Sequence, residues 1–223
     1  MLKPIFITST GTNIGKTYLT SLIIKKAQAL NFKVNAIKPI ISGFNIENFN
    51  TTDTGIISAA LGKDQSSIEE VSPWRFEAPL SPDQAAYKEN KEIVFKELID
   101  FCLKTLNPIK NINDIVLIEG VGGTMVPINN KYTTLDLMKA LDIPVILIIG
   151  SYLGSISHTL NAYEVLTQNN ININSIVINE SEENDIGINQ TRKTLLNHIK
   201  TISIFSLKRG DTDNIVDKIL NNI

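Results

Sequence analysis

The sequence predicts a three-layer, doubly wound α/β fold with a mainly parallel central sheet. Short runs that are apolar throughout alternate with amphipathic stretches along the whole chain, a pattern typical of parallel strands covered on both faces. The 223 residues are enough for one sizeable hydrophobic core and too few for two ordinary domains with a linker. We therefore expect a single domain over residues 1–223.

The expected elements follow one another in order. The apolar run 4–7 predicts a first strand, which passes through a polar loop into an amphipathic helix over 17–30. A second strand, 34–38, stops at Pro39. The same alternation predicts strands at 115–118, 145–149, 175–178 and 202–205, and helices near 91–106, 155–169, 190–199 and 213–223. Right-handed crossovers would bring the loops that follow the strands to one edge of the sheet.

The segment 41–82 interrupts this alternation. We expect it to be mostly irregular apart from a helix after Asp53. So long an insertion in a compact domain is more often a functional loop than a structural one.

The net charge and the lengths of the apolar runs limit which partners and which cellular compartment we expect. A net charge of −2 gives no long-range attraction to nucleic acid or to an anionic membrane, so we expect neither as a partner. The N-terminus lacks a signal-peptide pattern, and the longest apolar run, 145–149, is far shorter than a membrane span. We expect a soluble cytoplasmic protein whose single cysteine, Cys102, is a buried apolar residue and not a nucleophile.

The strongest chemical signal lies directly after the first predicted strand. Residues 9–17 read S-T-G-T-N-I-G-K-T and open the first helix, and the amino end of a helix binds phosphate through unpaired N–H groups. In a P-loop, Gly15 lets the backbone approach, Lys16 reaches the outer phosphates and Thr17 ligates Mg²⁺. A strict P-loop has its extra glycine one position before Gly11. The alternative is a plain strand–turn–helix link that contains G-K-T by chance. The strand before the motif and the helix after it favour a fold of the P-loop NTPase type.

Three charged residues lie where they could serve such a loop. Lys38 ends a strand in the stretch I-K-P-I-I-S-G and could offset charge on a transferring phosphoryl group, and Ser42 follows it. Glu119 ends the run 115–118 before three nearby glycines and could face a nucleotide-bound Mg²⁺. Asp53 could be a second magnesium carboxylate or only an N-cap. For Lys38, the alternative is a solvated surface charge.

Two weaker candidates come later in the chain. Residues 154–157, G-S-I-S, open the helix after the run 145–149 and could bind a carboxylate through their N–H groups, or simply cap the helix. Asn179 ends a strand and could hydrogen-bond a base edge or start a turn. His158 is expected to be structural.

In their order and spacing, these segments resemble the dethiobiotin synthetase family over nearly the whole chain. The shared segments are F-I-T-S-T-G-T-N-I-G-K-T, K-P-I-I-S-G, Asp53, P-W-R-F-E-A-P-L-S-P, E-G-V-G-G, P-V-I-L-I-I-G-S-Y-L-G-S-I-S-H and V-I-N. Two positions depart from the family pattern. The family usually has glycine at Ser9 and an acidic residue at Asn13, and the loop near residues 206–208 is not a close match.

The resemblance implies ATP and Mg²⁺ as cofactors, with Thr17, Asp53 and Glu119 as metal ligands. It assigns catalytic roles to Lys38, Lys16 and Thr12. The nucleotide-binding residues it implies are Asn13, Ile14, Gly15, Lys16, Thr17, Tyr18, Glu119, Gly120, Gly122 and Asn179, the last of which reads adenine. The substrate-binding residues it implies are Thr12, Ser42, Gly154, Ser155, Ile156 and Ser157. The last four belong to the partner chain of a homodimer, whose helix start receives the substrate carboxylate.

The implied reaction joins 7,8-diaminononanoate and CO₂ with consumption of ATP. A carbamate forms, attacks the γ-phosphoryl group to give a mixed anhydride, and the neighbouring amine closes the ureido ring of dethiobiotin.

Three alternatives remain. A switch ATPase of the chromosome-partitioning or septum-positioning type would carry a signature lysine at the position of Gly11 and a basic element, and the chain shows neither. A cobyrinate-type amidotransferase needs a glutaminase domain for which there is no room. A relative that binds nucleotide without turnover is the third.

Overall fold

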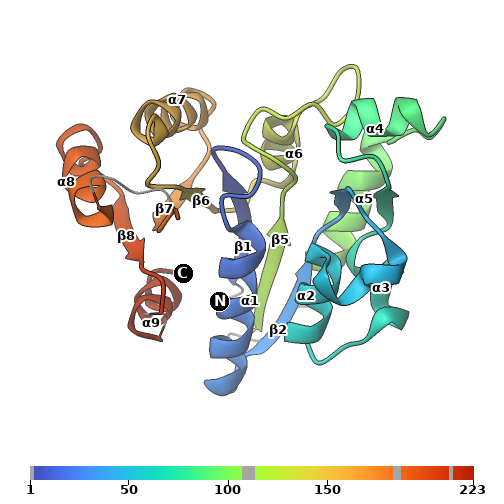
Figure 1. Ribbon diagram of the computed structural model, residues 1–223, viewed down its shortest axis with the longest axis horizontal. Coiled ribbons are helices and arrows are strands. Elements are labelled where there is room, and N and C mark those ends of the chain that lie inside the picture. The colour runs from blue at the N-terminus through green and yellow to red at the C-terminus, as the bar shows by residue number, and fades with distance from the viewer. Residues whose placement is uncertain (1–2, 107–113, 183–186, 211–212) are drawn as a thin grey trace.

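The computed structural model describes residues 3–106, 114–182, 187–210 and 213–223 (Figure 1). Within these residues, six strands form a central sheet in the order β2-β5-β1-β6-β7-β8, and every neighbouring pair is parallel. The strands are β1 (Lys3–Ser9), β2 (Lys33–Ile37), β5 (Asp114–Glu119), β6 (Val145–Ile149), β7 (Ile173–Asn179) and β8 (Ser203–Leu207). The structure confirms the predicted doubly wound, parallel α/β fold.

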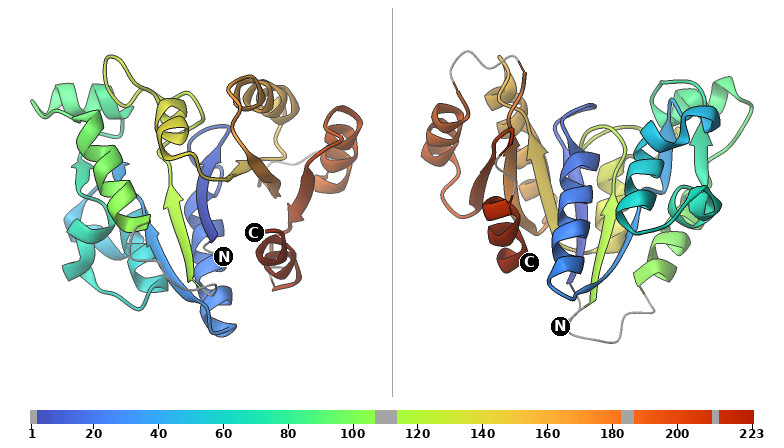
Figure 2. Two further views of the ribbon diagram at one scale, coloured as in Figure 1. Left: turned by 180° about the vertical axis from the view of Figure 1, so that it is seen from behind. Right: turned by 60° about the horizontal axis from the view of Figure 1, so that its bottom comes forward.

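Helices cover both faces of the sheet, as the views from two further sides show (Figure 2). One face packs against α1 (Lys16–Ala29), α2 (Asp53–Ala60) and α9 (Asp213–Asn222), and the other packs against α5 (Phe95–Leu106), α6 (Thr134–Leu141), α7 (Ser155–Gln168) and α8 (Ile188–His198). Successive strand residues point to opposite faces. In β1, Ile5 and Ile7 therefore join the core under α1, and Phe6 joins the core on the opposite face.

The topology places the candidate residues at one edge. From β1 the chain passes to the edge strand β2, returns to β5 and then crosses to β6, β7 and β8 on the other side of β1. Ligands of such sheets bind at the carboxyl ends of the strands near this reversal. Ile7 of β1 is in register with Glu119 of β5. The loop after β1 and the Glu119 side chain therefore leave the sheet side by side.

The expectation that 41–82 is mostly irregular is wrong. Two short strands, β3 (Ile40–Ser42) and β4 (Trp74–Phe76), pair in parallel as a second sheet. Between and after them lie η1 (Ile46–Thr51), α2, η2 (Gln65–Ser67), α3 (Ile68–Val71) and α4 (Pro82–Lys88). Three-residue strands and single helical turns are too short to show a period, and their pairing partners are far apart in sequence.

Two helix predictions also need correction. α6 was not expected, although Thr133 and Asp136 form a capping box at its start. α5 begins at Phe95 and not near 91, because the preceding chain turns inward to bury Ile93, whose carbonyl oxygen accepts a hydrogen bond from Asn129 at 3.0 Å.

Cys102 is fully buried in α5, as expected, and burial raises the pKa of its thiol to about 12. This excludes a thiolate nucleophile near neutral pH. In the described parts of the chain, we find no helix with the length and apolar character needed to cross a membrane.

Candidate functional site

The loop between β1 and α1 has the backbone of a phosphate-binding turn. Gly15 is the N-cap of α1 with φ of 101°, and no side chain caps the helix, so its first N–H groups remain available for an anion. A side chain at position 15 would overlap the amide of Asn179. The same amide donates a hydrogen bond to the carbonyl oxygen of Ile14 at 3.0 Å. Glycine is therefore required both for the backbone angle and for the close approach of Asn179.

Lys16 turns back over the loop, where it is 6% exposed. Its Nζ donates to the Oγ of Ser9 at 3.0 Å and to the carbonyl oxygens of Gly11 at 3.2 Å and Gly122 at 2.7 Å. Burial, followed by the nearby charge of Lys38, lowers the pKa of Lys16 to about 8. The ammonium group is therefore poised to lose its proton just above neutral pH.

The three predicted metal ligands come together around the Nζ of Lys38. This atom lies 2.7 Å from the Oε1 of Glu119 and 2.7 Å from the Oδ2 of Asp53. The hydroxyl of Thr17 donates to Glu119 Oε1 at 2.6 Å. Thr17 and Lys38 are each more than 80 residues from Glu119 in the sequence. They contact it because β1, β2 and β5 end at the same edge of the sheet.

In this cluster, burial and the neighbouring charges shift the pKa values of Lys38 and Asp53 in opposite directions, and the neighbouring charges prevail. Burial alone would lower the pKa of Lys38, but the charges of Glu119 and Asp53 outweigh it and leave the pKa above its ordinary value. For Asp53, burial would raise the pKa, and the Lys38 ammonium outweighs this effect and brings the pKa below its ordinary value. Lys38 is therefore charged, and Asp53 ionised, at neutral pH.

The structure tests one of the two interpretations of Asp53, the N-cap. The N-cap of α2 is Thr52, whose hydroxyl oxygen accepts from Gly55 N at 3.1 Å. Asp53 lies in the first turn, and its carboxylate faces Lys38. The N-cap interpretation of Asp53 is wrong.

Thr20 is a site residue that the sequence analysis missed. Its hydroxyl lies 2.7 Å from the Oε2 of Glu119 and 2.9 Å from the carbonyl oxygen of Lys16. The signal was its spacing of three residues from Thr17, which puts both hydroxyls on one face of α1. Between them, Thr17 and Thr20 engage both carboxylate oxygens of Glu119.

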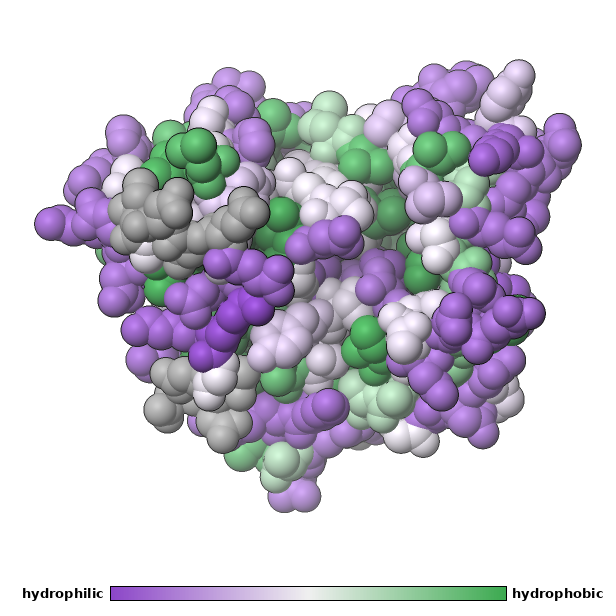
Figure 3. All heavy atoms as spheres, in the orientation of Figure 1, coloured by the Kyte–Doolittle hydropathy of each residue, from purple (hydrophilic) through white to green (hydrophobic). Residues whose placement is uncertain are grey.

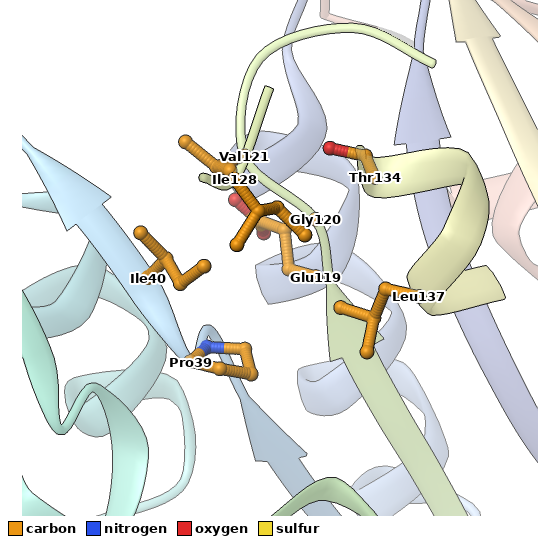
Figure 4. Close-up of a pocket in the computed structure, with 8 residues that line it drawn as sticks. All are labelled: Pro39, Ile40, Glu119, Gly120, Val121, Ile128, Thr134 and Leu137. Atoms are coloured by element: carbon orange, nitrogen blue, oxygen red, sulfur yellow. The ribbon is translucent and has the colours of Figure 1, made fainter. Parts of the chain in front are cut away.

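Apolar groups pack on another side of Glu119 (Figure 4). They enclose a cavity of about 10 Å³, lined by Pro39, Ile40, Glu119, Gly120, Val121, Ile128, Thr134 and Leu137. Such a cavity has room for about one water molecule. The carboxylate of Glu119, which is 0% exposed, therefore depends on α1 and Lys38 for its polar partners.

A large cavity of about 1020 Å³ opens beside this cluster, and the face drawn in Figure 3 is hollowed near its middle. The predicted residues that line it are Thr12, Asn13, Gly15, Lys16, Thr17, Tyr18, Lys38, Ser42, Asp53 and Gly122. The rest of the lining was not predicted from the sequence and comes largely from the segment 41–82: Ile41, Gly43, Ile56, Pro79, Leu80, Ser81, Pro82, Gln84, Val121 and Val126.

Several predicted residues lie outside this lining. Within the described chain, the predicted residues that do not line the cavity are Ile14, Glu119, Gly120, Asn179 and the segment 154–157. Asn179 and Ile14 contact each other next to the loop backbone. Gly154 is the N-cap of α7 with φ of 93°.

Comparison of the sequence with known proteins places the chain in a nucleotide-binding family. A family model described as an AAA domain matches residues 3–207. The ATP-dependent dethiobiotin synthetase BioD of Acidiphilium cryptum is 40% identical over 197 residues, covering 87% of each chain. The chain belongs to the dethiobiotin synthetase family. The synthetase of Clostridium botulinum, 34% identical, covers 96% of this chain and 93% of its own.

Solved structures share the fold at much lower identity. A plasmid partition protein from Borrelia burgdorferi superposes with a TM-score of 0.56 at 16% identity, with all of both chains covered. The MinC:MinD cell division complex of Aquifex aeolicus gives 0.54 at 14% identity, over 98% of this chain and 88% of that one. These similarities show a common P-loop fold and nothing about function.

The Lys38 cluster makes a prediction about stability. Replacing Lys38 by Met should lower the free energy of unfolding by about 3 kcal/mol, because the buried carboxylate of Glu119 loses its counter-ion. Adding Glu119→Gln should recover most of this loss. Denaturant titration measures both effects.

The matched control is Lys63→Met, which breaks an exposed pair with Glu70 that has the same 2.7 Å separation. It should cost less than about 1 kcal/mol. Equal losses for Lys38→Met and Lys63→Met would contradict the counter-ion role.

Proposed function

We propose that this chain is an ATP-dependent ligase that closes the ureido ring of 7,8-diaminononanoate with CO₂, giving dethiobiotin, ADP and phosphate. The observation that carries the proposal is its 40% identity, over 87% of each chain, to a protein named ATP-dependent dethiobiotin synthetase. The chemistry needs charge neutralisation and alignment more than covalent catalysis. The charged cluster beside a large cavity supports this requirement.

In the proposed mechanism, the nucleotide phosphates bind at the amino end of α1 and Lys16 contacts the outer ones. The substrate carbamate attacks the γ-phosphoryl group, ADP leaves, and the neighbouring amine then displaces phosphate from the mixed anhydride. Lys38 lines the cavity next to the loop and would stabilise the charge that develops on the transferring group. Thr12 also lines this cavity and would contact both the substrate and the phosphates.

We propose that Thr17, Asp53 and Glu119 hold Mg²⁺. The donor set fits this ion, since a hydroxyl and two carboxylates are hard oxygen ligands. Both carboxylates contact the Lys38 ammonium, and Thr17 donates to Glu119, which supports a preference for positive charge at this point. When bound, Mg²⁺ would neutralise phosphate charge.

The cavity also suits an amphipathic substrate. Ile41, Ile56 and Leu80 supply apolar surface for an alkyl chain. Among the described residues, the buried hydroxyl of Ser42 has no hydrogen-bond partner, and burying an unpartnered hydroxyl is costly. A polar group of the substrate would satisfy Ser42, which supports its assignment to substrate binding.

We further propose a homodimer whose two sites are shared between subunits. The N–H groups at the start of α7, residues 154–157, would receive the substrate carboxylate bound mainly by the partner subunit. Their absence, within the described residues, from the cavity of their own subunit agrees with this arrangement. We also propose that residues 1–223 form one synthetase domain, which works in the cytoplasm, where ATP is plentiful.

The first prediction tests the reaction itself. Phosphate release from ATP should rise strongly when 7,8-diaminononanoate and bicarbonate are added together, with dethiobiotin detected by mass spectrometry. A switch ATPase would instead respond to DNA or to a protein partner. An unchanged rate with the substrate pair would rule out the synthetase.

The pKa of Lys16 leads to a second prediction. Because the ammonium form is lost as pH rises through about 8, the dissociation constant for ATP should increase at least about tenfold between about pH 7 and about pH 9.5. Lys16→Arg remains charged over this range and should show a flat profile. Isothermal titration at each pH measures both. Parallel profiles for the two proteins would exclude Lys16 as the titrating group.

Mixing subunits tests the shared site. Lys38→Ala removes the lysine that one subunit contributes to the site. Ser157→Pro removes an N–H group that the other subunit contributes from the first turn of α7, where no intrahelical hydrogen bond is lost. Each variant alone should be inactive. Refolding them together should restore about a quarter of wild-type activity, since half the dimers are mixed and each contains one intact site. No recovery, with mixed dimers shown by native mass spectrometry, would argue for sites within single subunits.

A further inference from the structure

The three N–H groups of the Lys16 ammonium all have protein acceptors. A lysine ammonium carries three protons and accepts nothing. The Ser9 hydroxyl, the Gly11 carbonyl and the Gly122 carbonyl lie 3.0, 3.2 and 2.7 Å from Nζ. A phosphate oxygen can therefore bind Lys16 only by replacing one of these partners.

Ser9 is the one side chain among the three acceptors. Its hydroxyl is fully buried at the end of β1. The hydroxyl lies 2.6 Å from the carbonyl oxygen of Gly11 and 3.1 Å from that of Gly122, as a donor. With its single proton directed to a carbonyl, its oxygen is free to accept from Lys16.

We propose that Ser9 is a positioning residue that holds Lys16 back on the loop and so weakens the binding of outer phosphates. The inference rests on the proposed binding of ATP at this loop. A contact that must be exchanged when the ligand binds favours the unliganded protein and lowers the apparent affinity. Ser9 can give up this contact at little cost, because its hydroxyl keeps its bond to the Gly11 carbonyl oxygen when Lys16 leaves, and it is the acceptor that a substitution can remove.

The sign of the effect separates this role from a merely structural one. If Ser9 only shapes the loop, its removal should weaken the binding of every nucleotide. If Ser9 competes with phosphate for Lys16, its removal leaves one ammonium proton unpartnered, and a phosphate oxygen then satisfies that proton. Binding should become tighter, and only for nucleotides whose outer phosphates reach Lys16.

The experiment compares the dissociation constants of ATP and AMP by equilibrium titration. Ser9→Ala and Ser9→Gly should each bind ATP about tenfold more tightly than wild type, the size expected for one hydrogen bond to a charged group. AMP has no outer phosphates, so its affinity should not change. Ser9→Thr keeps the hydroxyl and should retain the wild-type affinity for ATP.

Ser175→Ala is the matched control. It makes the same substitution at a fully buried serine whose hydroxyl has no hydrogen-bond partner in the described parts of the chain, and it should leave both affinities unchanged. Weaker or equal ATP binding by Ser9→Ala and Ser9→Gly, or equal changes for ATP and AMP, would overturn the proposal. These measurements do not depend on dethiobiotin formation. A protein that binds ATP as expected but makes no dethiobiotin would refute the proposed reaction and leave the role of Ser9 intact.

Discussion

The buried carboxylate of Glu119 is the constraint on which the site depends. A charge with 0% exposure is tolerated only if it is paired and hydrogen-bonded. Here the partners come from two separate segments: Thr17 and Thr20 from α1, and Lys38 from the residue directly after β2. Neutralising one carboxylate therefore fixes the position of α1 and β2 relative to β5. The phosphate-binding loop, which opens α1, is positioned by the same contacts.

Close backbone packing next to this cluster has a functional consequence. A Cβ on Gly120 would lie 2.9 Å from the Phe6 ring, and one on Gly123 would lie 3.3 Å from Gly11 N. The glycine segment after β5 can therefore lie directly against the loop after β1. This approach places the Gly122 carbonyl on the Lys16 ammonium, so the two loops share one charged group. A displacement of either loop would therefore change the hydrogen bonds of Lys16 to the other.

The segment 41–82, after β2, shapes the large cavity beside the loop between β1 and α1. It supplies Ser42, Asp53 and most of the apolar lining of that cavity. Its strands β3 and β4 pair with each other in a sheet separate from the central one. Partition and septum-site proteins share the fold of this chain at 14–16% identity, so the central sheet alone says nothing about function. Under the proposed function, the loop would bind the phosphates, and the segment 41–82 would line the space for a second substrate.

The parallel sheet, the loop between β1 and α1, and the places of Lys38 and Glu119 at strand ends could all be predicted from the amino-acid sequence. Those predictions hold because apolar runs mark buried strands, and parallel strands bring their carboxyl ends to one edge. The β3–β4 sheet, the start of α5 and the contacts of Ser9 and Thr20 depend instead on how distant segments pack together. Three-residue strands carry no periodicity. A serine or threonine reveals its partner only once segments about a hundred residues apart, as Thr20 and Glu119 are, have been packed together.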